Sequence, residues 1–156
     1  KTFSGMMGQI LTWSGQIPIS QERGDRTALG RALEVLRRGG LLGIFPEGGR
    51  GRGDLASAGK GAAWLALQSE ATVVPVALLG TRYTGDLAAS WPRVRSPLVL
   101  DLGEPFRIHP IAGIPNRVRL DRATEEVRTR LAMHVADAST RHAIPLPTDI
   151  PPDLIP

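Results

Sequence analysis

The residues best suited to chemistry in this chain are a glutamate and an arginine separated by two glycines. Glu47, Gly48, Gly49 and Arg50 follow an apolar run that ends at Pro46. Proline has no N–H to donate to a sheet, and glycine reaches backbone angles that other residues avoid, so we expect a sharp loop at the end of a strand. Such a cationic loop could hold a phosphate group, and a solvated Gly/Arg loop is the alternative interpretation.

The elements that must position this loop alternate between strand and helix patterns. Apolar spacing and capping residues predict helices over Arg26–Arg38, Lys60–Ser69 and Arg119–Ala138. Short strands are predicted at Gln16–Ser20, Leu41–Phe45, Thr72–Leu79, Leu98–Leu102 and Phe106–Ile108, with a loop over Gly80–Pro97. Thr72–Leu79 is apolar on both faces, which favours an internal parallel strand. The fold class is therefore expected to be α/β, with a mixed, largely parallel sheet flanked by helices.

The two ends of the chain differ from this core. Apolar residues over Phe3–Trp13 recur at helical spacing, which predicts either a core helix or a helix at a membrane interface. The chain starts at Lys1, without a Met and within this pattern, so we expect the natural protein to extend upstream. Residues 1–143 are expected to form one domain, followed by a proline-rich C-terminal tail over 144–156.

Composition excludes several kinds of site. The chain has no Cys, which removes disulfides and thiolate zinc sites, and its three histidines lack metal-ligand spacing, so no metal is expected. Aromatic residues make up only 4% of the chain, which argues against a nucleic-acid partner, while the net charge of +4 is compatible with an anionic membrane surface. No apolar run approaches the roughly 20 residues of a membrane-spanning helix.

Three blocks of sequence occur in the order and spacing of a known family. They are Phe45–Arg50, Gly59–Ala66 and Val73–Ala77, the last followed by Gly80 and Thr81. Together they resemble the glycerolipid acyltransferases, and more narrowly the bacterial 1-acylglycerol-3-phosphate acyltransferases, over roughly residues 5–108. The resemblance implies the fold and chemistry of that family.

The resemblance also implies roles for individual residues. Arg23 and Arg50, with the backbone of Gly48 and Gly49, would hold the phosphate of the acceptor, and Glu47 would help to position its glycerol portion. Lys60 would contact the acyl donor or be structural, and Pro75 matches the proline of the family's fourth motif. Gly49 stands where the family usually has Thr, which removes one hydroxyl from the loop.

The family's general base is not found in this sequence. It is a His followed five positions later by an Asp, and none of His109, His134 and His142 has an Asp there. In the family this motif lies upstream of the region where the chain begins. A segment preceding Lys1 is the expected explanation, and genuine loss of the base is the alternative.

The expected function is transfer of a fatty acyl group from acyl-CoA or acyl-carrier protein to the free hydroxyl of lysophosphatidic acid, in phospholipid biosynthesis. No cofactor is expected beyond the acyl donor. The expected location is the cytoplasmic face of the cell membrane, either peripheral or anchored by a segment upstream of Lys1. Two alternatives remain: a phospholipid-binding module without the base, and a different phosphate-ligand enzyme on a similar scaffold.

Overall fold

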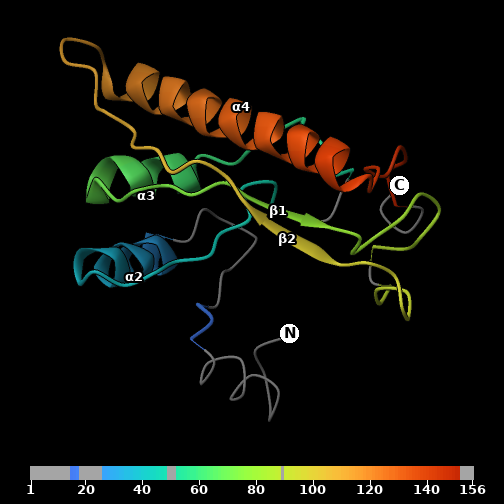
Figure 1. Cartoon of the computed structure of the whole chain (residues 1–156). Coiled ribbons are helices and arrows are strands. Elements are labelled where there is room, and N and C mark those ends of the chain that lie inside the picture. Colours follow the sequence, from blue (N-terminus) through green and yellow to red (C-terminus); the bar gives the residue numbers. More distant parts are fainter. Residues whose placement is uncertain (1–14, 18–25, 49–51, 89, 152–156) are drawn as a thin grey trace. The chain divides into compact units, whose positions relative to one another are not determined.

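The computed structural model describes residues 15–17, 26–48, 52–88 and 90–151. Its elements, in chain order, are α2 (Arg26–Arg37), α3 (Gly61–Ser69), β1 (Val76–Leu79), β2 (Val99–Leu102) and α4 (Asn116–His142) (Figure 1). The chain divides into two compact units, Lys1–Gly43 and Ile44–Pro156. The predicted helix over Phe3–Trp13 and most of the predicted strand Gln16–Ser20 lie outside the described residues, and Gln16 and Ile17 are not in a strand.

The first unit contains α2, whose apolar stripe buries Ala28, Ala32 and Leu33. The helix ends where glycine permits a reversal of the chain, because Gly39 has a φ of 78° and its N–H donates to the Leu36 carbonyl at 3.0 Å. This confirms the predicted helix to within one residue at its C-terminus.

The second unit holds an antiparallel pair of strands. β1 and β2 pair with Val76 opposite Leu102 and Leu79 opposite Val99. The prediction of an internal parallel strand over Thr72–Leu79 was therefore wrong. A parallel neighbour needs a crossover connection, usually a helix, whereas the chain returns from β1 to β2 through a loop without one.

Two further strand predictions were also wrong. Leu41–Phe45 is not a strand, and Leu41 is 96% exposed, because an apolar run forms a strand only where another strand pairs with its backbone, and no described strand does so. Phe106–Ile108 forms only an isolated bridge, through Phe106 and Val73.

The loop between the strands leaves β1 through a glycine that no other residue could replace without movement. Gly80 is buried with a φ of 81°, and a Cβ built on it would lie 2.0 Å from the Pro97 carbonyl oxygen. The two ends of the loop therefore lie against each other. The prediction that Gly80–Pro97 forms a loop is confirmed.

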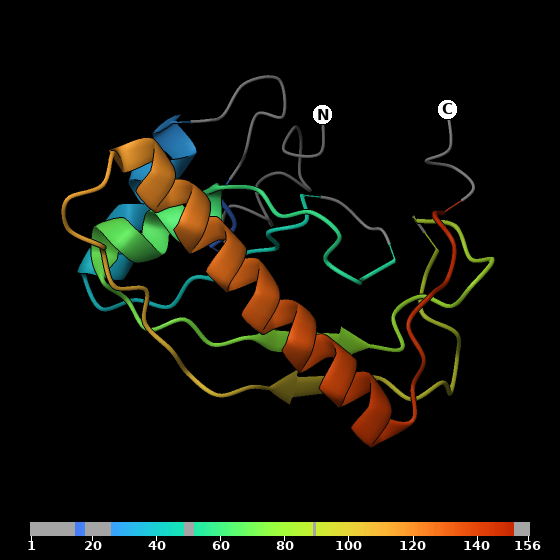
Figure 2. The same ribbon diagram turned by 90° about the horizontal axis from the view of Figure 1, so that it is seen from above.

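Helix α4 covers one face of the strands and one side of α3 (Figures 1 and 2). One core cluster lies over the sheet and consists of Leu55, Ala77, Leu79, Val135, Ala138 and Ile144. A second lies against α3 and consists of Ala63, Ala66, Phe106, Ile108, Ala123 and Val127. Burial of these apolar surfaces holds the helix in place.

The long helix exceeds its prediction at both ends. α4 runs from Asn116 to His142 rather than from Arg119 to Ala138, because polar residues at its ends continue the helix without extending the apolar stripe. Beyond it, residues 144–151 have no helix or strand but are packed: Ile144 and Pro151 are buried. The α3 prediction, Lys60–Ser69, is confirmed to within one residue.

Candidate functional site

The centre of the candidate site is a tight turn at Phe45–Gly48. The Gly48 N–H donates to the Phe45 carbonyl at 3.3 Å, and Gly48 has a φ of 71°, which favours glycine. The Pro46 carbonyl accepts a hydrogen bond from the Gly59 N–H at 2.7 Å. The predicted sharp loop is present, and this bond fixes it against the residues that precede α3.

Glu47 lies within this turn and is half-buried. Its burial raises the pKa of the carboxyl group above the ordinary value, and the nearby charge of Asp54 raises the pKa further. A carboxylate that is partly shielded from water makes a stronger hydrogen bond to a hydroxyl group than a fully hydrated one. Glu47 is therefore suited to orient a hydroxyl-bearing ligand, as the sequence resemblance implied.

Asp54 is held near Glu47 by an anchored loop. Leu55, the next residue, is buried in the core with a φ of 51°, and its carbonyl accepts a hydrogen bond from Arg128 Nη1 of α4 at 3.1 Å. Asp54 Oδ2 also lies 3.1 Å from Arg52 Nε in an ion pair. Sequence reasoning missed Asp54 as a neighbour of Glu47, because seven positions within a glycine-rich loop carry no fixed geometry.

Lys60 lies at the start of α3, directly after Gly59. Its carbonyl accepts the Trp64 N–H at 2.9 Å, the first bond of the helix, and its Nζ lies 2.5 Å from Asp121 Oδ1 of α4. Both side chains of this pair are about half exposed, and Lys60 lowers the pKa of Asp121 through their hydrogen bond. The ion pair gives Lys60 a structural role, and its exposure leaves the ammonium group accessible to an anionic ligand.

Pro75 serves the sheet rather than the turn. It is buried directly before β1, and its carbonyl accepts the Gly103 N–H at 2.8 Å, which continues the strand pairing by one bond. Arg23, Gly49 and Arg50, the other predicted phosphate-binding residues, lie outside the described residues. The structure thus brings the turn that contains Glu47 and Gly48 against Gly59, the residue before Lys60. It places Pro75 against the end of β2.

A second polar cluster joins β2 to the C-terminal part of α4. Asp101 accepts a hydrogen bond from His142 Nε2 on Oδ2 at 2.6 Å, and Arg141 Nη2 lies 3.6 Å from Oδ1. His134 Nε2 donates to the Asp101 carbonyl at 3.0 Å. The hydrogen bond from His142 holds the pKa of the Asp101 carboxyl below its ordinary value, and the charge of Arg141 lowers the pKa further. Sequence reasoning did not predict this convergence, because Asp101 is more than 30 residues from either histidine.

Two searches of the described residues found nothing further. Among residues 15–17, 26–48, 52–88 and 90–151, no group of three or more His, Cys, Asp or Glu side chains is arranged so that it could hold a metal ion. The same residues include no helix with the length and apolar character needed to cross a membrane.

Comparison with known proteins gives three matches. The profile of the family described as Acyltransferase matches residues 1–79. A protein named 1-acyl-sn-glycerol-3-phosphate acyltransferase from Bacillus subtilis is 26% identical over 125 residues, which cover 80% of this chain and 60% of the relative. A chloroplastic protein of Arabidopsis thaliana, 1-acyl-sn-glycerol-3-phosphate acyltransferase LPAT1, is 34% identical over 79 residues, 49% of this chain and 22% of the relative.

The chain thus spans less than two thirds of the length of either relative. No solved structure matches it significantly. The profile match ends at Leu79, the last residue of β1, so it includes the Glu47 turn and α3.

Proposed function

The chain belongs to the acyltransferase family, and we propose that it transfers a fatty acyl group to the free hydroxyl of lysophosphatidic acid. The acyl donor would be acyl-CoA or acyl-carrier protein. The names of the two relatives support this substrate, since both are 1-acyl-sn-glycerol-3-phosphate acyltransferases. The observation that carries the proposal is the half-buried Glu47 on a turn fixed by the Gly59–Pro46 hydrogen bond.

The reaction requires an acceptor held close to a thioester. The acceptor hydroxyl oxygen attacks the thioester carbonyl carbon, the new C–O bond replaces the C–S bond, and the hydroxyl proton passes through a base to the departing thiolate. In the family that the sequence resembles, that base is a His followed five positions later by an Asp. This pair does not occur among these 156 residues. The roles assigned to this chain are therefore the binding and orientation of the acceptor and contact with the donor.

Most of the predicted site residues would bind the acceptor, and Lys60 would bind the acyl donor. Arg50 and Arg23 would hold the phosphate, because a guanidinium group can donate two parallel hydrogen bonds to phosphate oxygens. The N–H groups of Gly48 and Gly49 would supply further donors, and Glu47 would accept a hydrogen bond from the glycerol portion. Lys60 would contact the phosphates of the acyl donor while retaining its pair with Asp121. No cofactor besides the acyl donor is needed for this chemistry.

A lipid acceptor places the reaction at a membrane. We propose attachment to the cytoplasmic face of the cell membrane, through the apolar stripe of Phe3–Trp13 or through an anchor upstream of Lys1. The excess of basic over acidic residues, 19 to 15, suits an anionic surface.

The test measures acyl transfer by the complete gene product with Arg50→Ala. Loss of one charge-assisted phosphate contact should lower kcat/KM for lysophosphatidic acid by at least about tenfold and leave the KM of the acyl donor unchanged. Arg52→Ala is the matched control, because Arg52 lies in the same loop but pairs with Asp54.

Equal effects of the two substitutions would contradict the role of Arg50. Vesicle binding without acyl transfer by the unaltered gene product would instead support the alternative, a catalytically incompetent phospholipid-binding module. Tight nucleotide binding would support an enzyme of another class.

A further inference from the structure

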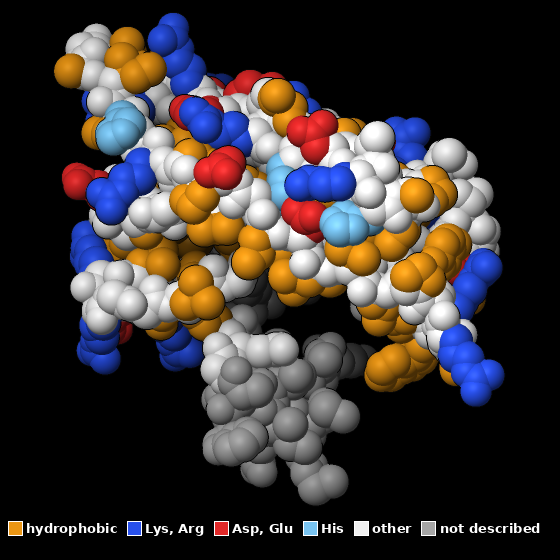
Figure 3. Space-filling view, viewed as in Figure 1, with side chains coloured by type: hydrophobic (Ala, Val, Ile, Leu, Met, Phe, Trp, Pro, Cys, Tyr) orange, Lys and Arg blue, Asp and Glu red, His pale blue; other side chains and the backbone are white. Residues whose placement is uncertain are grey.

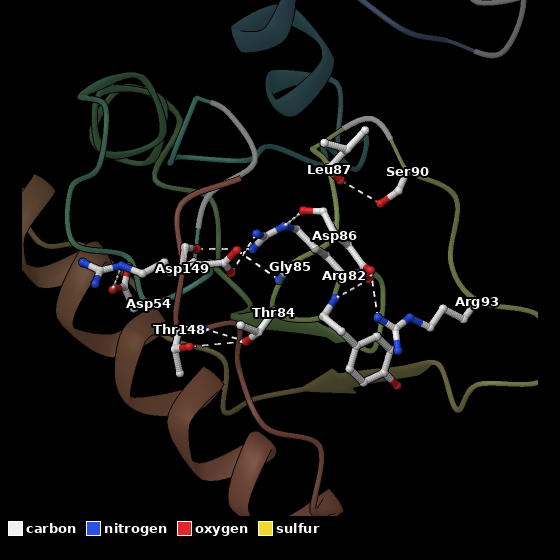
Figure 4. Close-up of polar contacts among 12 residues, drawn as sticks. Asp54, Arg82, Thr84, Gly85, Asp86, Leu87, Ser90, Arg93, Thr148 and Asp149 are labelled. Atoms are coloured by element: carbon white, nitrogen blue, oxygen red, sulfur yellow. Dashed lines mark hydrogen bonds and ion pairs between the residues drawn. The ribbon is translucent and has the colours of Figure 1, made fainter. Parts of the chain in front are cut away.

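The loop between β1 and β2 is built on a buried arginine. Arg82 is the buried charged residue among those described, and its Nη2 donates to Asp149 Oδ1 at 2.8 Å (Figure 4). Its Nε donates to the Asp86 carbonyl at 3.0 Å, and Asp149 Oδ2 accepts the Gly85 N–H at 3.0 Å. One guanidinium group and one carboxylate thus fix the first turn of the loop to the C-terminal segment.

The next part of the loop is fixed by Asp86. Its Oδ2 accepts the Tyr83 N–H at 3.0 Å, and its Oδ1 accepts a hydrogen bond from Arg93 Nη2 at 2.8 Å (Figure 4). The Arg93 guanidinium carbon lies 4.9 Å from the centre of the Tyr83 ring. These contacts join the outgoing and returning halves of the loop, so its outer part has a rigid support.

The outer part consists of two turns of the same construction. Ser90 donates both its N–H and its hydroxyl to the Leu87 carbonyl, at 3.1 and 2.7 Å. Ser96 does the same to the Arg93 carbonyl, at 3.1 and 2.8 Å. Each serine satisfies a carbonyl that would otherwise depend on water. The carbonyls of Leu87 and Arg93 thus have hydrogen-bond partners within the loop itself.

Apart from the two serines, the side chains on these turns are apolar or basic. Trp91 is 91% exposed and Val94 is 93% exposed, and Leu87 and Leu98 are also exposed. From residue 87 to residue 98 the sequence has two arginines and no acidic residue. Figure 3 shows hydrophobic and Lys/Arg side chains together at its lower right, where Figure 1 shows this loop.

We propose that this loop inserts Trp91 and Val94 into the headgroup region of an anionic phospholipid bilayer, with Arg95 against the lipid phosphates. Exposed large apolar side chains are costly in water, and tryptophan is favoured at the membrane interface, where its ring and its N–H are both accommodated. Arg95 adds positive charge beside these apolar side chains, whereas the charge of Arg93 is paired with Asp86, and a positive charge there complements an anionic surface. The rigid base allows insertion without the cost of ordering a flexible segment.

The inserted loop extends the proposed function, on which it rests for the lipid nature of the acceptor. The loop follows residues 1–79 of the acyltransferase match in the sequence, and it would be a membrane contact in addition to the one proposed at Phe3–Trp13. The membrane would then meet the chain at a fixed place relative to β1 and β2.

The absence of Cys from the chain makes a site-specific test direct. Val94→Cys in the full chain would carry an environment-sensitive fluorophore, and Met133→Cys on the exposed side of α4 is the matched control. With phosphatidylglycerol vesicles, emission at position 94 should rise by about twofold or more and be shielded from an aqueous quencher, while position 133 stays unchanged. Phosphatidylcholine vesicles should give a weaker response.

Three outcomes would overturn the proposal. They are equal responses at positions 94 and 133, no response at 94 while the protein sediments with vesicles, and shielding of 94 by rising protein concentration without lipid. The last would show that the loop pairs copies of this chain.

A paired measurement separates this proposal from the proposed function. The double variant Trp91→Ser, Val94→Ser should bind phosphatidylglycerol vesicles at least about tenfold more weakly, yet acylate a detergent-dispersed acceptor normally. Unchanged vesicle binding would overturn the loop proposal alone. Insertion at position 94 without acyl transfer by any form of the gene product would overturn the proposed function alone.

Discussion

Arg82 and Asp149 form an ion pair across 67 positions of sequence, with Nη2 and Oδ1 2.8 Å apart and the arginine side chain 7% exposed. The pair connects the residues after β1 to the segment after α4. A buried guanidinium group that loses its partners is costly, because water cannot replace them. This contact therefore ties the C-terminal segment to the sheet.

Replacement of Arg82 tests this tie. Arg82→Met should reduce the free energy of unfolding by about 2–3 kcal/mol, since hydrogen bonds from a charged group to Asp86 and Asp149 are lost. Glu126→Gln is the control, because the Glu126–Arg130 pair on α4 is exposed, and it should change the value by less than about 0.5 kcal/mol. Urea unfolding measures both. Similar losses in the two variants would contradict a special role for Arg82.

The contacts of Asp101 with His142 and Arg141 predict that the thermal stability of the protein depends on pH in the acid range. The pKa of Asp101 is lower in the folded chain than in the unfolded one, because His142 and Arg141 favour the charged carboxylate. The folded state therefore binds fewer protons than the unfolded state. The contribution of Asp101 to the free energy of unfolding is present above the unfolded pKa, and it is lost as the pH falls through the folded pKa. The thermal midpoint of Asp101→Asn should lie below that of the unaltered chain near neutral pH, and the difference should shrink below about pH 4.

A control on α4, the helix that carries Arg141 and His142, makes this result specific. Asp137 is exposed on α4, and Asp137→Asn should leave the pH dependence of the midpoint as it is in the unaltered chain. A difference between Asp101→Asn and the unaltered chain that widens toward low pH would have the wrong sign and would refute the assignment.

Glu47 predicts a second pH effect, this time on activity. The Asp54 charge helps to raise the pKa of Glu47, so Asp54→Asn should lower that pKa. If ionised Glu47 orients the acceptor, the acid limb of kcat/KM for lysophosphatidic acid should move to lower pH in this variant. Glu104→Gln, an exposed change elsewhere, should leave the limb in place. If the acid limb of kcat/KM does not move in Asp54→Asn, a group other than Glu47 produces it.

Sequence patterns predicted the helices better than the strands, for a physical reason. A helix such as Gly61–Ser69 satisfies its own backbone, so its apolar stripe and flanking glycines suffice to locate it. A strand needs a partner, and the apolar run of Thr72–Leu79 could not show that β2 would pair with it in the antiparallel sense. Leu41–Phe45 illustrates the same limit, since it has the pattern of a strand and no described partner.

In the candidate site, too, the local features were predicted and the contacts between distant residues were not. The turn at Phe45–Gly48 was readable because proline and glycine restrict the backbone locally. The hydrogen bond between Gly59 and Pro46, and the closeness of Asp54 to Glu47, are contacts between residues that are well separated in the sequence. No local rule encodes such contacts.

The close approach of Gly80 to the Pro97 carbonyl has a consequence for how this protein can change over time. The two ends of the β1–β2 connection are locked by backbone atoms, and that lock tolerates only glycine at position 80 without rearrangement. Of the residues that the structure describes between Leu87 and Ser96, none belongs to either core cluster. Substitutions in this stretch could therefore change the surface of the loop while the strands and the two core clusters keep their structure.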